Sequence, residues 1–168
     1  MSGARVLNVG VFVEGASDRS VLLRVCQEYG FDLSVRARHG NYQGSRVLNE
    51  WRKLASRVPE QKLIFVFDAD KEPDVARLLA DKPNAIANRS VVFLVAPWRG
   101  IEDFTENMLD DAARIDYEEQ RAQGVSKRIL AELFAPRITR NRLLEHAWIA
   151  NTFVKCLQCQ CPPDRTVA

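Results

Sequence analysis

Short apolar runs alternate along this chain with longer segments in which apolar residues recur every three or four positions. The first kind of pattern predicts buried strands, and the second predicts helices with one face turned to a core. We expect four strands, at residues 5–13, 33–38, 62–67 and 90–96. Between them we expect helices at residues 18–29, 45–57 and 73–80.

This alternation of strands and helices favours βαβ crossovers, which join parallel strands. The sequence therefore predicts an α/β fold with a mostly parallel four-stranded sheet flanked by helices. Ser17 precedes the first helix and is its predicted N-cap. Beyond Pro97 the pattern becomes helical, and we expect helices at residues 101–109, 126–134 and 140–153. The predicted organisation is an α/β domain over residues 1–110, a helical C-terminal extension over 111–155 and a disordered tail over 156–168.

Composition limits the function only weakly. The 24 basic and 22 acidic residues leave a net charge of +2, which neither requires nor excludes a nucleic-acid partner. No apolar stretch approaches the roughly 20 residues that cross a bilayer, so we expect a cytoplasmic protein without membrane contact.

The cysteines do not form the pattern of a disulfide framework. Cys26 stands alone, whereas Cys156, Cys159 and Cys161 crowd the end of the chain. Together with His146 the three could supply four zinc ligands, but their spacing matches no common zinc motif, which favours reduced thiols.

Acidic residues follow two of the predicted strands. Glu14 and Gly15 follow the first, and Asp68-Ala69-Asp70 follows the third. If these strands are parallel neighbours, their carboxyl ends meet at one edge of the sheet, where α/β proteins build their sites. Crowded carboxylates repel one another unless a cation neutralises them, and Mg²⁺ takes carboxylate and phosphate oxygens. The pattern therefore predicts a magnesium site for phosphate chemistry.

Some of these acids also have structural interpretations. Asp68 and Asp70 are typical of an Asx-turn that caps the following helix. Asp18, Glu102 and Asp103 stand in the first turns of predicted helices, where the helix dipole favours acids without any metal. Glu14 has no such alternative, because an acid directly after five apolar strand residues serves little structural purpose.

The order of these motifs resembles the TOPRIM domain, the metal-binding fold shared by topoisomerases, bacterial primases and the OLD-family nucleases. The resemblance covers about residues 5–110, and the segments that carry it are Val13-Glu14-Gly15 with Asp18, and Phe67-Asp68-Ala69-Asp70. It implies that Glu14 is a general acid/base or a metal ligand and that Asp68 and Asp70 hold Mg²⁺.

The resemblance also implies a second metal ion. OLD-like nucleases use an aspartate four residues after the glutamate, which matches Asp18, and short TOPRIM proteins have a segment similar to Ile101-Glu102-Asp103. Asp18 and Glu102 are thus the expected ligands of that ion, and Mn²⁺ is expected to replace Mg²⁺.

Basic residues near the same edge of the sheet are candidates for binding a nucleic-acid backbone. A solvated basic surface, or pairing with the acids, explains them equally well. The candidates are Arg36, Arg38, His39, Arg46, Lys71 and Arg99.

These features favour a small Mg²⁺-dependent nuclease that hydrolyses phosphodiester bonds of RNA or DNA, with a role as a toxin or phage-defence effector. The chain has no room for the DNA gate of a topoisomerase or the additional parts of a primase. One alternative is a non-catalytic TOPRIM module whose C-terminal helices dock onto a partner such as an ATPase. Another is a phosphatase of the haloacid-dehalogenase type, which is disfavoured because its Asp-x-Asp pair normally follows the first strand, where this chain has Glu14-Gly15.

Overall fold

The computed structural model describes residues 3–37, 51, 53, 55–80 and 89–158. Most of the predicted helix at 45–57 lies outside these residues, although Trp51, Lys53 and Ala55 are helical. The predicted site residues Arg38, His39 and Arg46 and the cysteines Cys159 and Cys161 also lie outside them.

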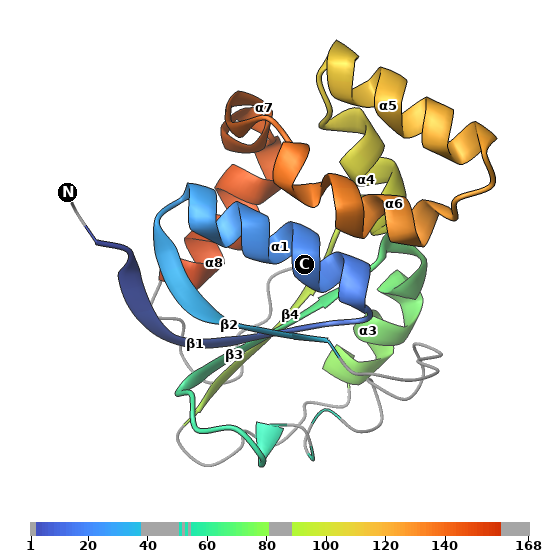
Figure 1. Cartoon of the computed structure of the whole chain (residues 1–168). Coiled ribbons are helices and arrows are strands. Elements are labelled where there is room, and N and C mark those ends of the chain that lie inside the picture. The colour runs from blue at the N-terminus through green and yellow to red at the C-terminus, as the bar shows by residue number, and fades with distance from the viewer. Residues whose placement is uncertain (1–2, 38–50, 52, 54, 81–88, 159–168) are drawn as a thin grey trace.

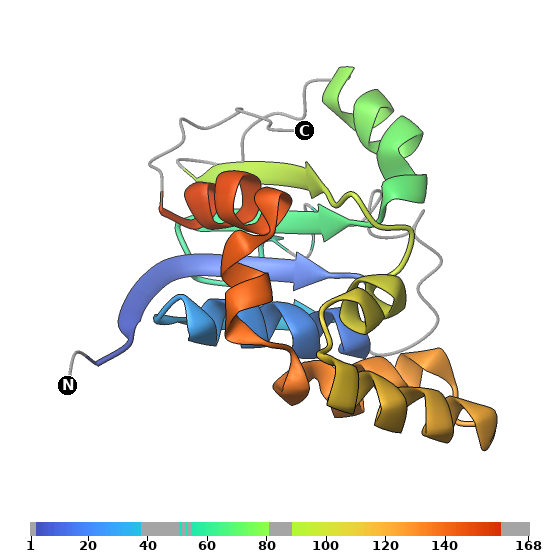
Figure 2. The ribbon, with the colours of Figure 1, turned by 90° about the horizontal axis from the view of Figure 1, so that it is seen from above.

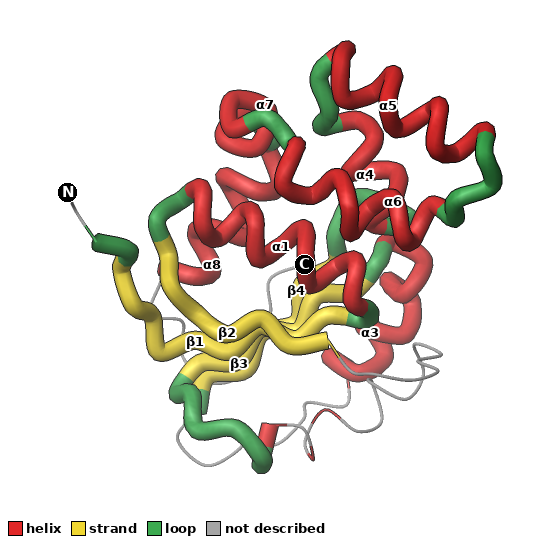
Figure 3. Tube along the Cα trace, in the orientation of Figure 1, coloured by secondary structure: helices red, strands yellow, loops and turns green. Residues whose placement is uncertain are grey.

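A four-stranded parallel sheet forms the centre of the fold. Its strands are β1 (Arg5–Val13), β2 (Phe31–Ala37), β3 (Lys62–Phe67) and β4 (Ser90–Val95). Their order across the sheet is β2-β1-β3-β4, and every neighbouring pair is parallel. Figure 3 shows the strands side by side, and the arrowheads in Figure 2 point in one direction. The α/β fold class expected from the apolar runs is confirmed.

Helices follow β1 and β3 and make up most of the described chain after β4 (Figure 1). Before β4 the described helices are α1 (Ala16–Glu28), the 3₁₀ turn η1 (Ala69–Lys71) and α3 (Glu72–Ala80). After β4 they are α4 (Ile101–Asn107), α5 (Asp111–Ala122), α6 (Lys127–Phe134), the 3₁₀ turn η2 (Ala135–Arg137), α7 (Arg140–Glu145), the π-helical turn η3 (Ile149–Phe153) and α8 (Val154–Gln158).

Three local predictions differ from the structure. Gly15, not Ser17, caps α1, and Ser17 is buried inside the first turn at 2% exposure. The single helix expected over residues 140–153 is divided, because His146 has an extended backbone that ends α7. The helix α5 was not expected at all.

Each face of the sheet packs against its own hydrophobic cluster. Along β1, Val11 and Val13 face the larger cluster, whereas Phe12 faces the smaller one. The larger cluster joins the sheet to α1 and to the helices from α4 to α8, which Figure 1 shows on one side of the sheet. The smaller cluster is rich in aromatic rings, with Phe65 stacked 4.7 Å from Phe12 and 5.4 Å from Phe93. The strand alternation thus produces a three-layered molecule.

The C-terminal helices belong to the same core as the sheet. A guanidinium nitrogen of Arg24 on α1 donates to the carbonyl of Ile138 at 3.2 Å. The ammonium group of the buried Lys62, at the start of β3, donates to the carbonyl of Cys156 on α8. In Figure 2 the orange and red segments that carry α7, η3 and α8 lie across the strands. The larger core therefore continues through the boundary predicted near residue 110.

The end of the described chain also differs from the prediction. The expected tail begins at residue 156, but α8 extends to Gln158 and buries Cys156 and Leu157. Within the described ranges, no helix has the length and apolar character needed to cross a membrane.

Candidate metal centre

The strand order brings the two acidic segments together. From β1 the chain passes to β2 on one side of the sheet and later returns to β3 on the other side, so β1 and β3 flank the topological switch point. Open parallel sheets bind ligands at the carboxyl ends of the strands beside such a point. Glu14 follows β1 directly and Asp68 follows β3 directly, and the backbone N–H of Asp68 donates to Oε2 of Glu14 at 3.4 Å.

A small polar cavity of about 180 Å³ opens at this point, and carboxyl groups from four places in the chain line it. Two cations, Lys71 and Arg128, stand at its wall. The acids are Glu14, Asp18, Asp68 and Glu102, which are four of the five metal ligands predicted from the sequence.

Asp70, the fifth predicted ligand, is not part of the cavity lining. Its side chain is 55% exposed, and its Oδ2 accepts a hydrogen bond from Nζ of Lys71 at 3.1 Å. Since Lys71 itself lines the cavity, Asp70 stands behind that cation and acts on the site through its charge.

Glycines allow two of these acids to approach the backbone closely. Asp18 comes from the first turn of α1, and its Oδ2 lies 3.3 Å from the place that a Cβ on residue 15 would occupy. The carboxyl group of Glu102 folds over Gly100 so closely that a Cβ at residue 100 would force it to move. Both glycines have extended backbones, which any residue can adopt. What matters at these positions is therefore the absence of a side chain, which leaves room for the carboxyl groups.

The turns after β3 and β4 hold the acids from the other side. The backbone N–H of Ala69 donates to the carbonyl of Trp98 at 2.9 Å, and that of Ala96 donates to the carbonyl of Phe67 at 2.8 Å. These bonds fix the segment that carries Asp68 against the segment that leads to Glu102. The site is therefore built on backbone that hydrogen bonds hold in place.

Two carboxyl groups of the cavity, those of Asp68 and Asp18, have raised pKa values. Burial raises the pKa of Asp68 to about 9, with further increases from the charges of Asp18 and Glu14. Burial also raises the pKa of Asp18 to about 7, and the charges of Glu14 and Glu102 add to it. Both shifts mean that the site resists carrying several negative charges at once.

A divalent cation fits this donor set. Oxygen ligands are those that Mg²⁺ prefers, and a positive ion would relieve the repulsion that raises these pKa values. Among the residues that the structure describes, no three His, Cys, Asp or Glu side chains are grouped tightly enough to hold an ion as they stand. The acids would have to rotate toward one another on binding.

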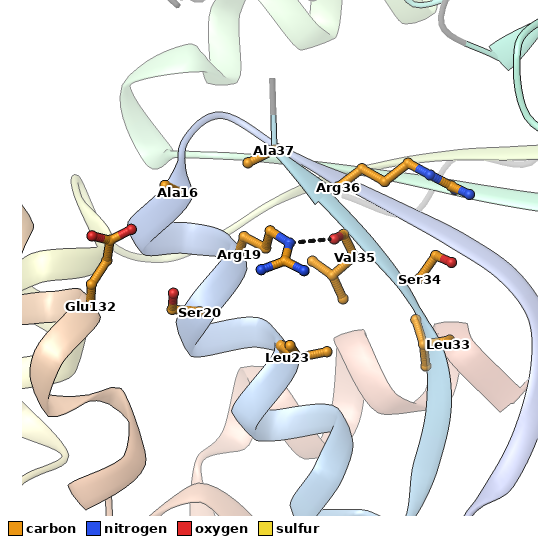
Figure 4. Close-up of a pocket in the computed structure, with 10 residues that line it drawn as sticks. All are labelled: Ala16, Arg19, Ser20, Leu23, Leu33, Ser34, Val35, Arg36, Ala37 and Glu132. Carbon is orange, nitrogen blue, oxygen red and sulfur yellow. Dashed lines mark hydrogen bonds between the residues drawn. The ribbon is translucent and has the colours of Figure 1, made fainter. Parts of the chain in front are cut away.

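The remaining basic residues that were predicted to bind nucleic acid are dispersed. Arg36 donates to Glu60 at 2.7 Å, and its guanidinium lies 5.9 Å from the ring centre of Phe12. Figure 4 shows it pointing away from Arg19, which donates to the carbonyl of Val35 at 3.0 Å in the groove between α1 and β2. Arg99 is exposed and lines a different cavity, beside Asp103.

Arg128 is the site residue that the sequence interpretation missed. It lies in the first turn of α6, where the helix dipole disfavours cations. Lys127 stands beside it in the same turn and pairs with Asp103 at 3.6 Å. Two basic residues directly after a serine N-cap are a feature of the sequence that could have pointed to a functional site. Helix stability alone does not account for them.

The fold and this cavity define an α/β protein with a Rossmann-like parallel sheet and an acidic site at the switch point. No family model, curated protein or solved structure matches the chain. The TOPRIM assignment therefore stays a prediction based on the motifs.

Proposed function

We propose that the protein is a Mg²⁺-dependent nuclease of the TOPRIM type that hydrolyses phosphodiester bonds in RNA or DNA. The observation that carries the proposal is the convergence of Glu14, Asp18, Asp68 and Glu102 on one cavity at the switch point. Carboxyl groups whose pKa values are raised by burial and by one another are typical of functional sites.

The cavity residues have distinct roles in the proposed reaction. Glu14 and Asp68, which are linked through the backbone N–H of Asp68, hold one Mg²⁺. Asp18 and Glu102 hold a second ion. The bound ions lower the pKa of a coordinated water and neutralise charge on the phosphate. Lys71 and Arg128 bind the non-bridging phosphate oxygens, and Mn²⁺ replaces Mg²⁺ at the same ligands.

In the proposed hydrolysis, the oxygen of a water forms a bond to phosphorus while the bond from phosphorus to the leaving oxygen breaks. Glu14 takes the proton of the attacking water, and the leaving oxygen receives a proton from solvent. No oxidant or further reactant is needed. We place this activity in the cytoplasm, which suits the buried, reduced thiol of Cys26.

A cleavage assay with the full chain tests the proposal. Labelled tRNA, single-stranded RNA, single-stranded DNA and plasmid are each incubated with Mg²⁺, Mn²⁺ or EDTA. We expect cleavage of at least one substrate with either metal, none with EDTA, and a loss of 100-fold or more in rate for Glu14→Gln, about the effect of removing a general base. Glu118→Gln, an exposed acid on α5, is the matched control and should cleave normally. Equal activity of Glu14→Gln and the parent protein would contradict the catalytic assignment.

The alternative of a non-catalytic interaction module has one observation in its favour. Ile115 on α5 and Ile129 and Leu133 on α6 are 58%, 50% and 56% exposed and could contribute apolar contacts to a partner. A module of this kind predicts that no substrate is cleaved with any metal. The cleavage assay therefore separates the two functions.

A further inference from the structure

A second cavity is lined by the turn between β4 and α4 and by residues of α4 itself. Its volume is about 350 Å³, which falls in the range of small-molecule sites. Consecutive residues of α4 divide between the two cavities, since Glu102 lines the acidic one and Asp103 and Phe104 line the other. The two cavities are therefore lined by neighbouring residues at the start of α4.

Aromatic rings form one wall of this second cavity. The ring centres of Trp98 and Phe104 are 4.4 Å apart, and the ring of His146 lies 5.2 Å from Phe104 and 6.2 Å from Trp98. Trp98 and Phe104 are mostly buried, so their positions are fixed by the core. The parts of these rings that reach the cavity form a fixed apolar wall, against which a flat heteroaromatic group can pack without any rearrangement.

Polar groups also line this cavity. Asn107 is exposed at the end of α4, and its side chain makes no hydrogen bond to any other described residue. The Nδ1 atom of His146 accepts from the backbone N–H of Ile149 at 3.3 Å, so in the neutral ring Nε2 carries the proton and is a donor. Burial lowers the pKa of His146, which keeps the ring neutral near pH 7. The cavity thus offers an amide, a carboxylate on Asp103 and an imidazole N–H.

Arg99 adds a positive charge at the mouth. Its side chain is exposed and has no ion-pair partner among the described residues. The combination of an aromatic wall, hydrogen-bonding groups and a cation, next to a cavity suited to phosphate chemistry, matches the parts of a nucleotide.

We propose that the cavity formed by Trp98, Phe104, Asn107 and His146 binds one unpaired nucleobase next to the phosphodiester that is cleaved. A base can enter only when it is not paired in a duplex, so the substrate is single-stranded at the point of cleavage. This inference rests on the proposed nuclease function and names the class of its substrate.

Abasic oligonucleotides test the inference directly. A single-stranded substrate is synthesised with one base missing at each position around the cleaved bond in turn. We expect one position at which loss of the base raises KM by about tenfold or more, the effect of losing one stacked base. The same sequence in a duplex should be cleaved at least tenfold more slowly.

A blocking variant links this effect to the cavity. Asn107→Phe places a bulky side chain at the mouth, and Asn141→Phe, at an exposed position on α7, is the matched control. We expect Asn107→Phe to raise KM by about tenfold, to leave kcat within a few-fold and to abolish the difference between the intact and abasic substrates. The control should behave as the parent protein does.

A second measurement is independent of cleavage. Without metal, adenosine, guanosine, cytidine and uridine are titrated while the tryptophan fluorescence is followed, because Trp98 lines the cavity. At least one nucleoside should quench the fluorescence of the parent protein in a saturable way, and should bind Asn107→Phe about tenfold more weakly.

The possible failures can be told apart. Equal cleavage of intact and abasic substrates would overturn the inference and leave the proposed nuclease standing. Saturable nucleoside binding without any cleavage would overturn the nuclease and leave base binding in this cavity. Absence of both would overturn both.

Discussion

Asp68 lies at the end of β3, where burial and the charges of Asp18 and Glu14 raise its pKa to about 9. An aspartate whose pKa is higher in the folded than in the unfolded protein binds its proton more tightly when folded. The free energy of unfolding therefore falls as pH rises from about 4, the ordinary pKa, towards 9. Asp18, whose pKa is raised to about 7, contributes in the same direction over the lower part of this interval.

We predict that Asp68→Asn stabilises the metal-free protein at pH 8, because the amide is neutral in both states, whereas the carboxylate of Asp68 has to take up a proton on folding at this pH. The expected gain is at least about 1 kcal/mol, since each unit of pKa shift is worth about 1.4 kcal/mol and pH 8 lies several units above the ordinary pKa of aspartate. Urea denaturation at pH 8 and at pH 5 measures it, and the gain should shrink at the lower pH. A loss of stability at pH 8 would show that the carboxylate is a structural partner.

When Mg²⁺ is bound, the parent protein should become more stable than Asp68→Asn. An ion that binds only the folded protein stabilises it by about 2.7 kcal/mol when the ion concentration is 100 times the Kd. We therefore expect added Mg²⁺ to raise the Tm of the parent protein and to raise that of Asp68→Asn much less. An equal rise in both would remove Asp68 from the proposed ligands.

Arg128 provides a test of the cations around the cavity. We predict that Arg128→Ala lowers kcat/KM for nucleic-acid cleavage by about tenfold or more, because a charged contact to phosphate is lost. Its Tm should stay the same or rise slightly, since the substitution also removes a cation from the first turn of α6. Arg121→Ala, at an exposed position on α5, is the control. Equal kcat/KM values for the two variants would leave Arg128 as a solvated surface residue.

Helix α5 shows how a helix can be overlooked in a sequence. Only Ala113 and Tyr117 are buried on it, four residues apart, while Ile115 is exposed between them. The apolar stripe is too sparse to stand out. The start of the helix is nevertheless specified locally, because the side chain of Asp110 accepts a hydrogen bond from the backbone N–H of Ala113 at 2.7 Å.

We predict that Asp110→Ala lowers the free energy of unfolding by about 1 kcal/mol, the usual effect of removing an N-cap. Asp111→Ala is the matched control, because Asp111 lies in the first turn and interacts only with the helix dipole, which is worth about 0.3 to 1 kcal/mol. Thermal or urea denaturation of both variants gives the comparison. A cost for Asp110→Ala no larger than that for Asp111→Ala would mean that the cap contributes nothing.

Helix α1 begins earlier in the sequence than an N-cap at Ser17 would place it. Gly15 ends β1 with an extended backbone and caps the helix directly, so Ser17 lies within the first turn. This abrupt change from strand to helix places Asp18 at the cavity. An N-cap at Ser17 would have moved the first turn away from the end of β1.

The helices after β4 pack onto the sheet. They cover the same face of the sheet as α1 and share one hydrophobic cluster with it. Arg140 on α7 also pairs with Glu28 on α1 at 3.3 Å. Without these helices, much of the larger cluster would be exposed to water, which costs about 25 cal/mol for each Å² of apolar surface.

We therefore predict that residues 1–110 alone do not unfold cooperatively. Circular dichroism and differential scanning calorimetry of this fragment, compared with the full chain, measure the transition. The full chain should show one sharp transition and the fragment none. A cooperative transition of the fragment near the Tm of the full chain would instead support an independent domain ending near residue 110.

The sequence alone determined the α/β fold class, the four strands to within two residues at their ends, and the acids that follow them. These features are local, because a run of apolar residues predicts a buried strand wherever that strand lies in the sheet. The adjacency of β1 and β3 that the strand-end acids required is confirmed by the strand order. The TOPRIM assignment and the bound metals stay predictions.

Only the tertiary structure decided which side chains share the cavity. It brought Arg128 in from α6, left Asp70 outside behind Lys71, and turned Arg99 and Asp103 toward a second cavity. No pattern within a single segment contains this information, because the positions depend on how α4 and α6 pack against α1. Packing of distant segments sets where each side chain points, whereas the order of residues sets only which element carries it.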